Sequence, residues 1–197
     1  MRAFPRWFRF RRVRLCGAAV YVHWSVLLVI AILGLVSIQS PIHACVAIAS
    51  YLSVIVIHEL GHALVSQRLG YEVFAIRIAF IHGSCEHEAP DTLLDDVWIA
   101  WGGVLAQLTV AIPVLVFGSV TEDFDLGYLA PTIAFLGYFN LVIALVNLAP
   151  GPGMDGQLAW RAVPLIFGWL RARRSARQVL TALKRKRQPS WVQKNRR

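Results

Sequence analysis

The chain has 197 residues, of which 57% are hydrophobic and 16% are charged, and its formal net charge is +9. Because soluble domains carry about 25% charged residues, this composition excludes an ordinary soluble domain and indicates a membrane protein. Six of the 20 Lys and Arg residues lie between positions 2 and 14, and twelve lie between positions 161 and 197. Basic ends around an apolar region follow the positive-inside rule and argue against nucleic-acid binding. The three cysteines are far apart and imply no disulfide framework.

In chain order, we predict a basic cytoplasmic N-terminus at residues 1–16, a membrane-embedded domain at residues 17–170 and a basic cytoplasmic tail at residues 171–197. Four apolar segments of the membrane domain have about the length that crosses a bilayer. They are Tyr21–Ile38, Ala44–Gln67, Val97–Val120 and Leu126–Leu148. We interpret the first segment as a retained anchor rather than a cleaved signal, because no clear cleavage site follows it.

The charges also predict how these segments are oriented. With the basic N-terminus in the cytoplasm, the second segment ends near Arg68 on the cytoplasmic side. The loop after the third segment contains Glu122, Asp123 and Asp125 but no Lys or Arg, so it lies outside. The fourth segment then returns, which leaves the arginine-rich tail inside.

The second apolar segment contains His58-Glu59-Leu60-Gly61-His62, the most informative pattern in the chain. On a helix His58 and His62 share one face, so both imidazoles can bind one zinc ion. Glu59 lies about 100° round the helix, where it can take a proton from a zinc-bound water. A satisfied polar cluster is the alternative. Ionisable groups within an apolar span are costly, however, which favours a functional metal site.

Residues 70–87 alternate between two faces in the manner of strands, and this predicts a β-hairpin or small sheet at the membrane edge. The predicted fold class is therefore an all-α polytopic membrane protein with about four transmembrane helices and a small membrane-edge β-hairpin or sheet. The same segment holds three residues of types that ligate metals, although a solvated loop is the favoured interpretation: His82, Cys85 and His87.

A third zinc ligand must come from outside the HELGH helix, because a catalytic zinc takes three protein ligands and one water. Asn147–Gly156 closes the fourth apolar segment, and its Pro and Gly residues end the helix in an irregular loop. The predicted orientation places this loop on the same side as His58. Asp155 is the natural third ligand, and an ordinary turn aspartate is the alternative.

These two motifs together resemble those of the site-2 protease family of intramembrane zinc metalloproteases. HELGH lies in one span, and a later span ends in the Asn147, Pro150, Pro152 and Asp155-Gly156 pattern. The segment at residues 20–25 also resembles the strand-then-helix start of minimal bacterial members.

Between the two motifs the chain departs from the family pattern. Where the family often has Gly-Pro-x-x-Asn, this stretch of the chain has no proline, and Gln107 replaces the asparagine. The departure leaves open how this stretch faces the substrate, although it does not touch the zinc-binding motifs.

The resemblance covers residues 17–157 and implies a three-helix catalytic core made by the second, third and fourth apolar segments. It implies a minimal member, without a PDZ insertion or a C-terminal regulatory domain. It also implies zinc ligands at His58, His62 and Asp155, and a general base at Glu59. Asn147 matches a residue proposed to bind substrate or to steady the tetrahedral oxyanion, and a helix-ending asparagine is the alternative.

The predicted function is that of an intramembrane zinc metalloendopeptidase with one zinc ion per chain. It would hydrolyse a peptide bond in or near a transmembrane segment of a membrane-protein substrate, close to the cytoplasmic face. The predicted partners are that transmembrane helix and the lipid bilayer of a prokaryotic inner membrane, and no nucleic acid.

Two alternatives stand beside this prediction. A catalytically silent zinc-binding protein, or pseudoprotease, would not need the carboxylate of Glu59. A metal transporter would carry polar residues in several spans, whereas the third and fourth segments offer little before Asn140 beyond Gln107 and Thr109.

Overall fold

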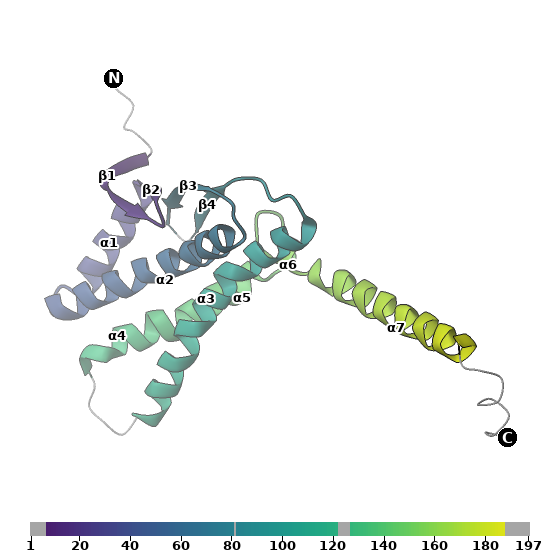
Figure 1. Ribbon diagram of the computed structural model, residues 1–197. Coiled ribbons are helices and arrows are strands. Elements are labelled where there is room, and N and C mark those ends of the chain that lie inside the picture. Colours follow the sequence, from purple (N-terminus) through teal and green to yellow (C-terminus); the bar gives the residue numbers. More distant parts are fainter. Residues whose placement is uncertain (1–6, 81, 122–126, 188–197) are drawn as a thin grey trace. The chain divides into compact units, whose positions relative to one another are not determined.

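The computed structural model describes residues 7–80, 82–121 and 127–187 (Figure 1). The chain divides into two compact units, Met1–Trp160 and Arg161–Arg197, which we describe separately. The first unit contains a small sheet and all of the helices up to α6. In the second unit the described residues form one helix, α7 (Ala162–Arg187). This helix continues across the predicted boundary between residues 170 and 171.

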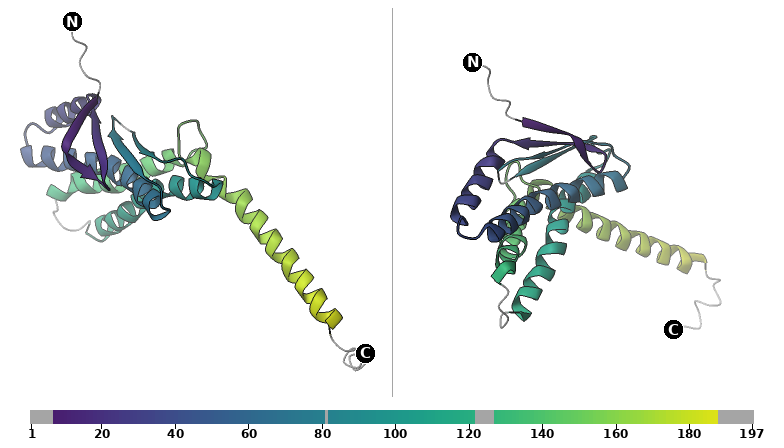
Figure 2. Two further views of the ribbon diagram at one scale, coloured as in Figure 1. Left: turned by 45° about the horizontal axis from the view of Figure 1, so that its top comes forward. Right: turned by 90° about the vertical axis from the view of Figure 1, so that its left-hand side faces the viewer.

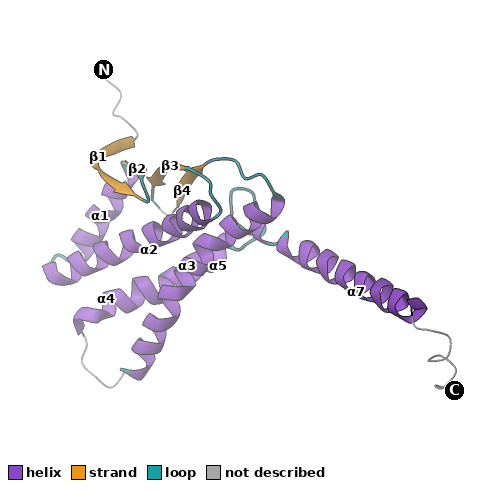
Figure 3. Ribbon diagram, viewed as in Figure 1, coloured by secondary structure: helices purple, strands orange, loops and turns teal. Residues whose placement is uncertain are grey.

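The sheet has four strands in the order β1-β2-β3-β4, coloured orange in Figure 3. Strands β1 and β2 form an antiparallel hairpin, β2 and β3 are parallel, and β3 and β4 are antiparallel. Cys16 and Gly17 join β1 to β2, and both have a positive φ, as a two-residue hairpin loop that matches the strand twist requires. The strands are β1 (Trp7–Leu15), β2 (Ala18–His23), β3 (Val73–Ile78) and β4 (Gly83–His87).

Three helices in the described part of the chain are long and apolar enough to cross a membrane. The first two are α2 (Pro41–Arg68) and α3 (Leu93–Val120). The third, Ala130–Asn147, follows the short η1 (Gly127–Leu129). It consists of α4 (Ala130–Thr132), the π-helical η2 (Ile133–Phe139) and α5 (Asn140–Asn147). The remaining helices of this unit are α1 (Ser25–Val36) and α6 (Gly156–Ala159).

Local sequence explains where the long helices begin. Pro41 occupies the first turn of α2, where its missing N–H breaks no helical hydrogen bond. Thr92 precedes α3, and its side chain accepts a hydrogen bond from the backbone N–H of Asp95 at 3.1 Å. Asp95 and Asp96 also place negative charge at the positive end of the helix dipole.

The first predicted span differs from the structure. Its N-terminal part is the strand β2, and only 12 residues form the helix α1. Twelve helical residues extend about 18 Å, against about 30 Å of hydrocarbon, so α1 alone is too short to cross. The count of four spans is therefore not supported by helix length, and a fourth crossing stays a prediction.

The sheet is also larger than predicted, because the basic segment 7–15 is the strand β1. Its arginines match the basic flank of a membrane span, although Phe8, Phe10 and Val13 between them favour a strand. The outermost residues of both predicted basic ends, 1–6 and 188–197, lie outside the described residues. The predicted outer-loop acids Glu122, Asp123 and Asp125 lie outside them too.

The sheet and α3 both contact α2, which is the central helix of the first unit (Figures 1 and 2). Val20 and Ile76 of the sheet belong to one buried cluster with Val26 of α1 and Ile55 of α2. Ile76 is fully buried, as is Val54 of α2. One side of α2 is thus covered by strands, which leaves another for α3.

The helices α2 and α3 approach closely at a pair of glycines. A Cβ atom added to Gly61 would lie 2.3 Å from the carbonyl oxygen of Gly102, and one added to Gly102 would lie 2.7 Å from that of Gly61. Small residues at such a crossing are common between membrane helices, because they let the backbones touch. The close approach brings the HELGH motif against α3.

We expect Gly61→Ala to destabilise the protein by about 1–3 kcal/mol, because the added methyl group meets backbone rather than a flexible side chain. Thermal unfolding of the detergent-purified protein measures this. Gly34→Ala in α1 is the matched control, since a Cβ there meets nothing within 4 Å. Equal melting temperatures for the two variants would contradict the proposed crossing.

Candidate metal centre

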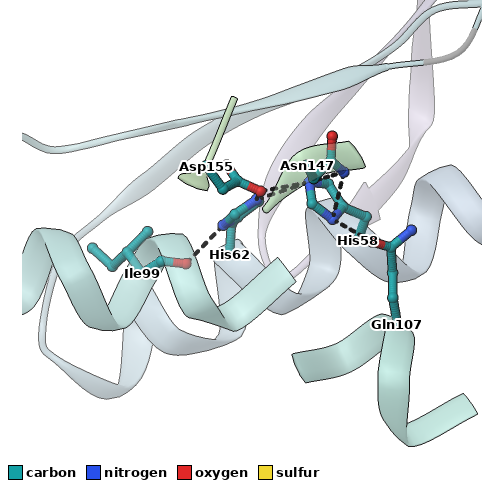
Figure 4. A network of polar contacts seen from close by, with 6 residues as sticks. All are labelled: His58, His62, Ile99, Gln107, Asn147 and Asp155. Carbon is teal, nitrogen blue, oxygen red and sulfur yellow. Dashed lines mark hydrogen bonds and ion pairs between the residues drawn. The ribbon is translucent and has the colours of Figure 1, made fainter. Parts of the chain in front are cut away.

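His58 and His62 lie side by side on α2, and both are buried, with 8% and 7% of their surface exposed. Their Nε2 atoms are 3.1 Å apart. The Oδ2 atom of Asp155 lies 3.1 Å from Nε2 of His58 and 3.3 Å from Nε2 of His62. Three atoms that can bind a metal therefore converge on one point, from residues separated by almost a hundred positions (Figure 4).

The size of this triangle fits zinc. Tetrahedral ligands at about 2.0–2.1 Å from a zinc ion are about 3.3 Å from one another, close to the observed separations. The chemistry of the donor set fits as well, because two imidazole nitrogens and a carboxylate oxygen are usual ligands of a catalytic zinc. A fourth position is left for water or substrate.

Hydrogen bonds to the other ring nitrogens determine which tautomer each histidine adopts. Nδ1 of His62 donates to the backbone carbonyl of Ile99 at 2.7 Å, and Nδ1 of His58 donates to Oε1 of Gln107 at 3.0 Å. Both Nε2 atoms then present lone pairs toward the carboxylate of Asp155. Oδ2 of Asp155 is buried and has no hydrogen-bond partner, so a cation is the group that satisfies all three acceptors.

Burial alone would raise the pKa of the Asp155 carboxyl. When the two imidazoles carry a proton on Nε2, they outweigh this effect through hydrogen bonding and charge, and they hold the pKa of this carboxyl below its usual range. Asp155 is therefore ionised at neutral pH, which is the state that binds a metal.

The Pro- and Gly-rich loop after α5 carries Asp155 to the histidines. The loop folds back on itself so closely that a Cβ on Gly156 would lie 2.2 Å from the carbonyl oxygen of Leu148. Nε1 of Trp160 donates to that same carbonyl at 2.7 Å, and Gly153 has a φ of 78°. The glycines are thus required for the turn that places the third predicted ligand.

Glu59 faces the same cavity, of about 310 Å³, as the three ligand residues. Its side chain is 2% exposed, and its Oε2 atom has no hydrogen-bond partner. The backbone N–H of Gly83, where β4 begins, donates to this carboxylate. A Cβ on Gly83 would lie 2.4 Å from Oε1 of Glu59, so the β3–β4 hairpin comes over the carboxylate at a point where only glycine fits.

Asn147 lies at the edge of the ligand group, with Nδ2 at 3.3 Å from Nε2 of His58. Asn140, on the same helix, is fully buried, and its Nδ2 donates to the backbone carbonyls of Gln107 and Leu136. The first contact joins α5 to α3, so Asn140 binds the helices together and does not reach the metal ligands.

Two residues of α3 belong to this centre, although sequence reasoning left their role open. Gln107 accepts the hydrogen bond from His58, and Gly103 faces both histidines. The signal for Gln107 was a lone amide in an apolar span; nothing in the sequence pointed to Gly103 as a contact.

Cys85 lines the cavity, but it does not belong to the group of possible ligands. Among the described residues, His58, His62 and Asp155 form the one group of three His, Cys, Asp or Glu residues close enough to hold a metal. His82 and His87 also line the cavity, and among the described residues neither joins such a group.

The chain resembles known zinc proteases in sequence and in fold. It is 26% identical over 175 residues to zinc metalloprotease MJ0392 of Methanocaldococcus jannaschii, a match that covers 86% of this chain and 50% of that protein. It is 33% identical over 105 residues to the putative zinc metalloprotease sll0528 of Synechocystis sp., which covers 52% of this chain and 27% of that protein.

The solved structure of the site-2 protease from Methanocaldococcus jannaschii superposes with a TM-score of 0.60 and 25% identity, over 80% of this chain and 71% of that one. In fold and in sequence, the chain is therefore similar to this site-2 protease. No family model matches it. It spans half or less of the length of the two curated relatives.

The similarity to a site-2 protease agrees with the three helices of spanning length, and together they indicate an integral membrane protein. The relatives' names also support zinc as the metal at His58, His62 and Asp155.

We expect Gly103→Ala to weaken zinc binding by more than about tenfold. The added Cβ would lie 2.5 Å from Nε2 of His62 and 2.7 Å from Cε1 of His58, within the space that the ligands need. Metal analysis of the purified protein measures the loss. Gly118→Ala on the same helix is the control, because its Cβ meets the flexible side chain of Ile133 at 3.1 Å. Full zinc content in the Gly103 variant would contradict the geometry.

We also expect Cys85 to react slowly with alkylating reagents at pH 8. Burial raises the pKa of its thiol to about 12, and the charge of Glu59 adds to this effect, so the reactive thiolate is scarce. In protein with Cys16 and Cys45 replaced by alanine, the rate for Cys85 should be at least about tenfold below that of a Ser84→Cys, Cys85→Ser variant. Ser84 is the exposed neighbour on β4. Similar rates would show that the thiol is accessible and ionised.

Proposed function

We propose that this protein is a zinc metalloendopeptidase that cleaves a peptide bond in or near a transmembrane segment of a membrane-protein substrate. One observation carries the proposal. A buried carboxylate, Glu59, faces the same cavity as the His58, His62 and Asp155 triad, on a helix long and apolar enough to span a bilayer. The names of the relatives, zinc metalloprotease and site-2 protease, support the same chemistry.

Zinc bound by the three ligands would polarise the scissile carbonyl and lower the pKa of water in its open position. The residues of this chain supply the rest of the reaction. Glu59 takes a proton from the attacking water as the new C–O bond forms, and it delivers that proton to the amine nitrogen as the C–N bond breaks. Asn147, beside His58, donates a hydrogen bond to the developing oxyanion.

The substrate must be unwound locally, because the carbonyls of a helix are occupied by its own hydrogen bonds. Strand β4 is the last strand of the sheet, so one of its edges is unpaired within the described sheet. Gly83, Ser84, Cys85 and His87 of this strand line the cavity. We propose that an extended substrate pairs with this edge and is held across the metal centre.

The cleaved bond lies near the cytoplasmic face in this proposal, and both ends of the chain are cytoplasmic. The support is the concentration of arginines at the two ends together with the position of HELGH in the second half of α2. A prokaryotic inner membrane stays a prediction from size and arginine content.

We expect Glu59→Gln to reduce cleavage by at least about a thousandfold while zinc stays bound, because the ligands are untouched and only the proton acceptor is lost. Comparing membrane-protein fragments in cells that express wild type or variant measures this effect. A substrate should accumulate uncut with the variant, and its cytosolic fragment should appear only with wild type. In purified protein, a chelator should stop cleavage, and added zinc should restore it.

The alternatives give different results in the same experiment. Identical fragment profiles, with one zinc retained per chain, would favour a catalytically silent zinc-binding protein. Zinc flux into vesicles that does not depend on Glu59 would favour a transporter.

A further inference from the structure

Gln107 makes a contact that the family's zinc motifs do not include. Its side chain lies on α3 and is fully buried. Its Oε1 atom is 3.0 Å from Nδ1 of His58, on the side of the ring away from the other ligands (Figure 4). A hydrogen bond from Nδ1–H to this oxygen leaves the Nε2 lone pair of His58 free for the metal.

The two histidine ligands depend on different kinds of partner. His62 donates to the backbone carbonyl of Ile99, which no side-chain substitution removes. His58 donates to a side chain, so its tautomer and ring orientation depend on the residue at position 107.

The amide of Gln107 has one orientation that suits a metal site. If it were reversed, Nε2 would donate to Nδ1 of His58, and the proton of the ring would move to the Nε2 of His58. That proton would then point toward Nε2 of His62 and Oδ2 of Asp155, where the metal binds. With Oε1 toward His58, Nε2 of Gln107 is buried without a partner. An unsatisfied buried donor is costly, and an apolar residue at position 107 would avoid that cost. The contact of Oε1 with His58 is therefore the feature that explains a glutamine at this position.

We propose that Gln107 is a positioning residue, which sets the tautomer and orientation of His58 and thereby the affinity of the centre for zinc. The proposal rests on the zinc site of the proposed function, but not on proteolysis. It also gives a meaning to the departure from the Gly-Pro-x-x-Asn pattern. From the same backbone position an asparagine is one methylene shorter, and it does not span the contact that the glutamine makes with His58.

Zinc affinity of the detergent-purified full chain, measured by competition with a chromophoric chelator, tests the proposal. Gln107→Met keeps the length and helix propensity of the side chain but removes the acceptor, and we expect about 10–100-fold weaker binding. Gln107→Glu keeps an acceptor at the same place and should bind within about threefold of wild type, because carboxylates commonly hold metal-bound histidines. The melting temperature of the zinc-free Met variant should match that of zinc-free wild type.

Asn140→Met is the matched control. It removes the other fully buried carboxamide from the facing helix, which touches the backbone of Gln107 but not His58. Its zinc affinity should stay within about threefold of wild type. An equal loss in this variant would assign the effect to helix packing and overturn the proposal.

Two further results would also overturn it. One is a Met variant that binds zinc as tightly as wild type, and the other is a Glu variant as weak as the Met variant. If the Met variant does not fold, Gln107→Asn replaces it, with weaker zinc binding than Gln107→Glu expected. A wild-type protein that binds zinc but cleaves nothing would contradict the protease and leave this inference intact.

Discussion

The close approach of α2 and α3 at Gly61 and Gly102 is the constraint on which the metal centre depends. It lets the two backbones touch at the level of the HELGH motif. The carbonyl of Ile99 and the side chain of Gln107 then reach the Nδ1 atoms of His62 and His58. One helix therefore provides the two imidazoles of the candidate metal centre, and its neighbour hydrogen-bonds to both of them.

The same crossing explains why the metal site has room. Gly103 is one residue beyond Gly102 on α3, and it faces His58 and His62 at a distance that admits no side chain. Between most packed helices, side chains fill the space and would block an open coordination site. Here Gly102 permits backbone contact with α2, and Gly103 leaves space around His58 and His62.

Among the described residues, three of the five buried side-chain atoms without a hydrogen-bond partner lie around this centre. Oε2 of Glu59, Oδ2 of Asp155 and Nε2 of Gln107 are all buried and unpaired, on a fold that is otherwise apolar enough to lie in a bilayer. Such atoms lower the stability of a protein, and they persist where they act on a ligand or on a reaction. A metal ion would satisfy the carboxylate of Asp155, and water or substrate in the cavity would meet that of Glu59.

The sheet contributes to the site from the opposite side of α2. Strand β4 begins at Gly83, against Glu59, and then continues along the cavity. The sheet packs on α2 through Val20, Ile76 and their neighbours in the hydrophobic cluster. The hairpin that covers Glu59 is thus packed on α2, the helix that carries Glu59. This packing holds Gly83 next to the carboxylate.

The sequence by itself determined the local part of this chemistry. The four-residue spacing of His58 and His62 gives a shared helical face in any fold, and the apolar residues around them indicate a membrane helix. The Pro and Gly pattern around Asp155 likewise predicts a loop. Local geometry decides these features, so they could be predicted without knowledge of packing.

Only the tertiary structure decided which distant groups meet. The contact of Gln107 with His58, the glycine at position 103 and the cover of Glu59 by Gly83 depend on how helices and strands pack, and no spacing in the sequence encodes those distances. The strand β1 was missed for a related reason: its arginines match a membrane flank, and its pairing with β2 depends on a turn at Cys16 and Gly17. The sequence thus specified the candidate ligands, and packing specified the hydrogen-bond partners of the two histidines, the space around them and their surroundings.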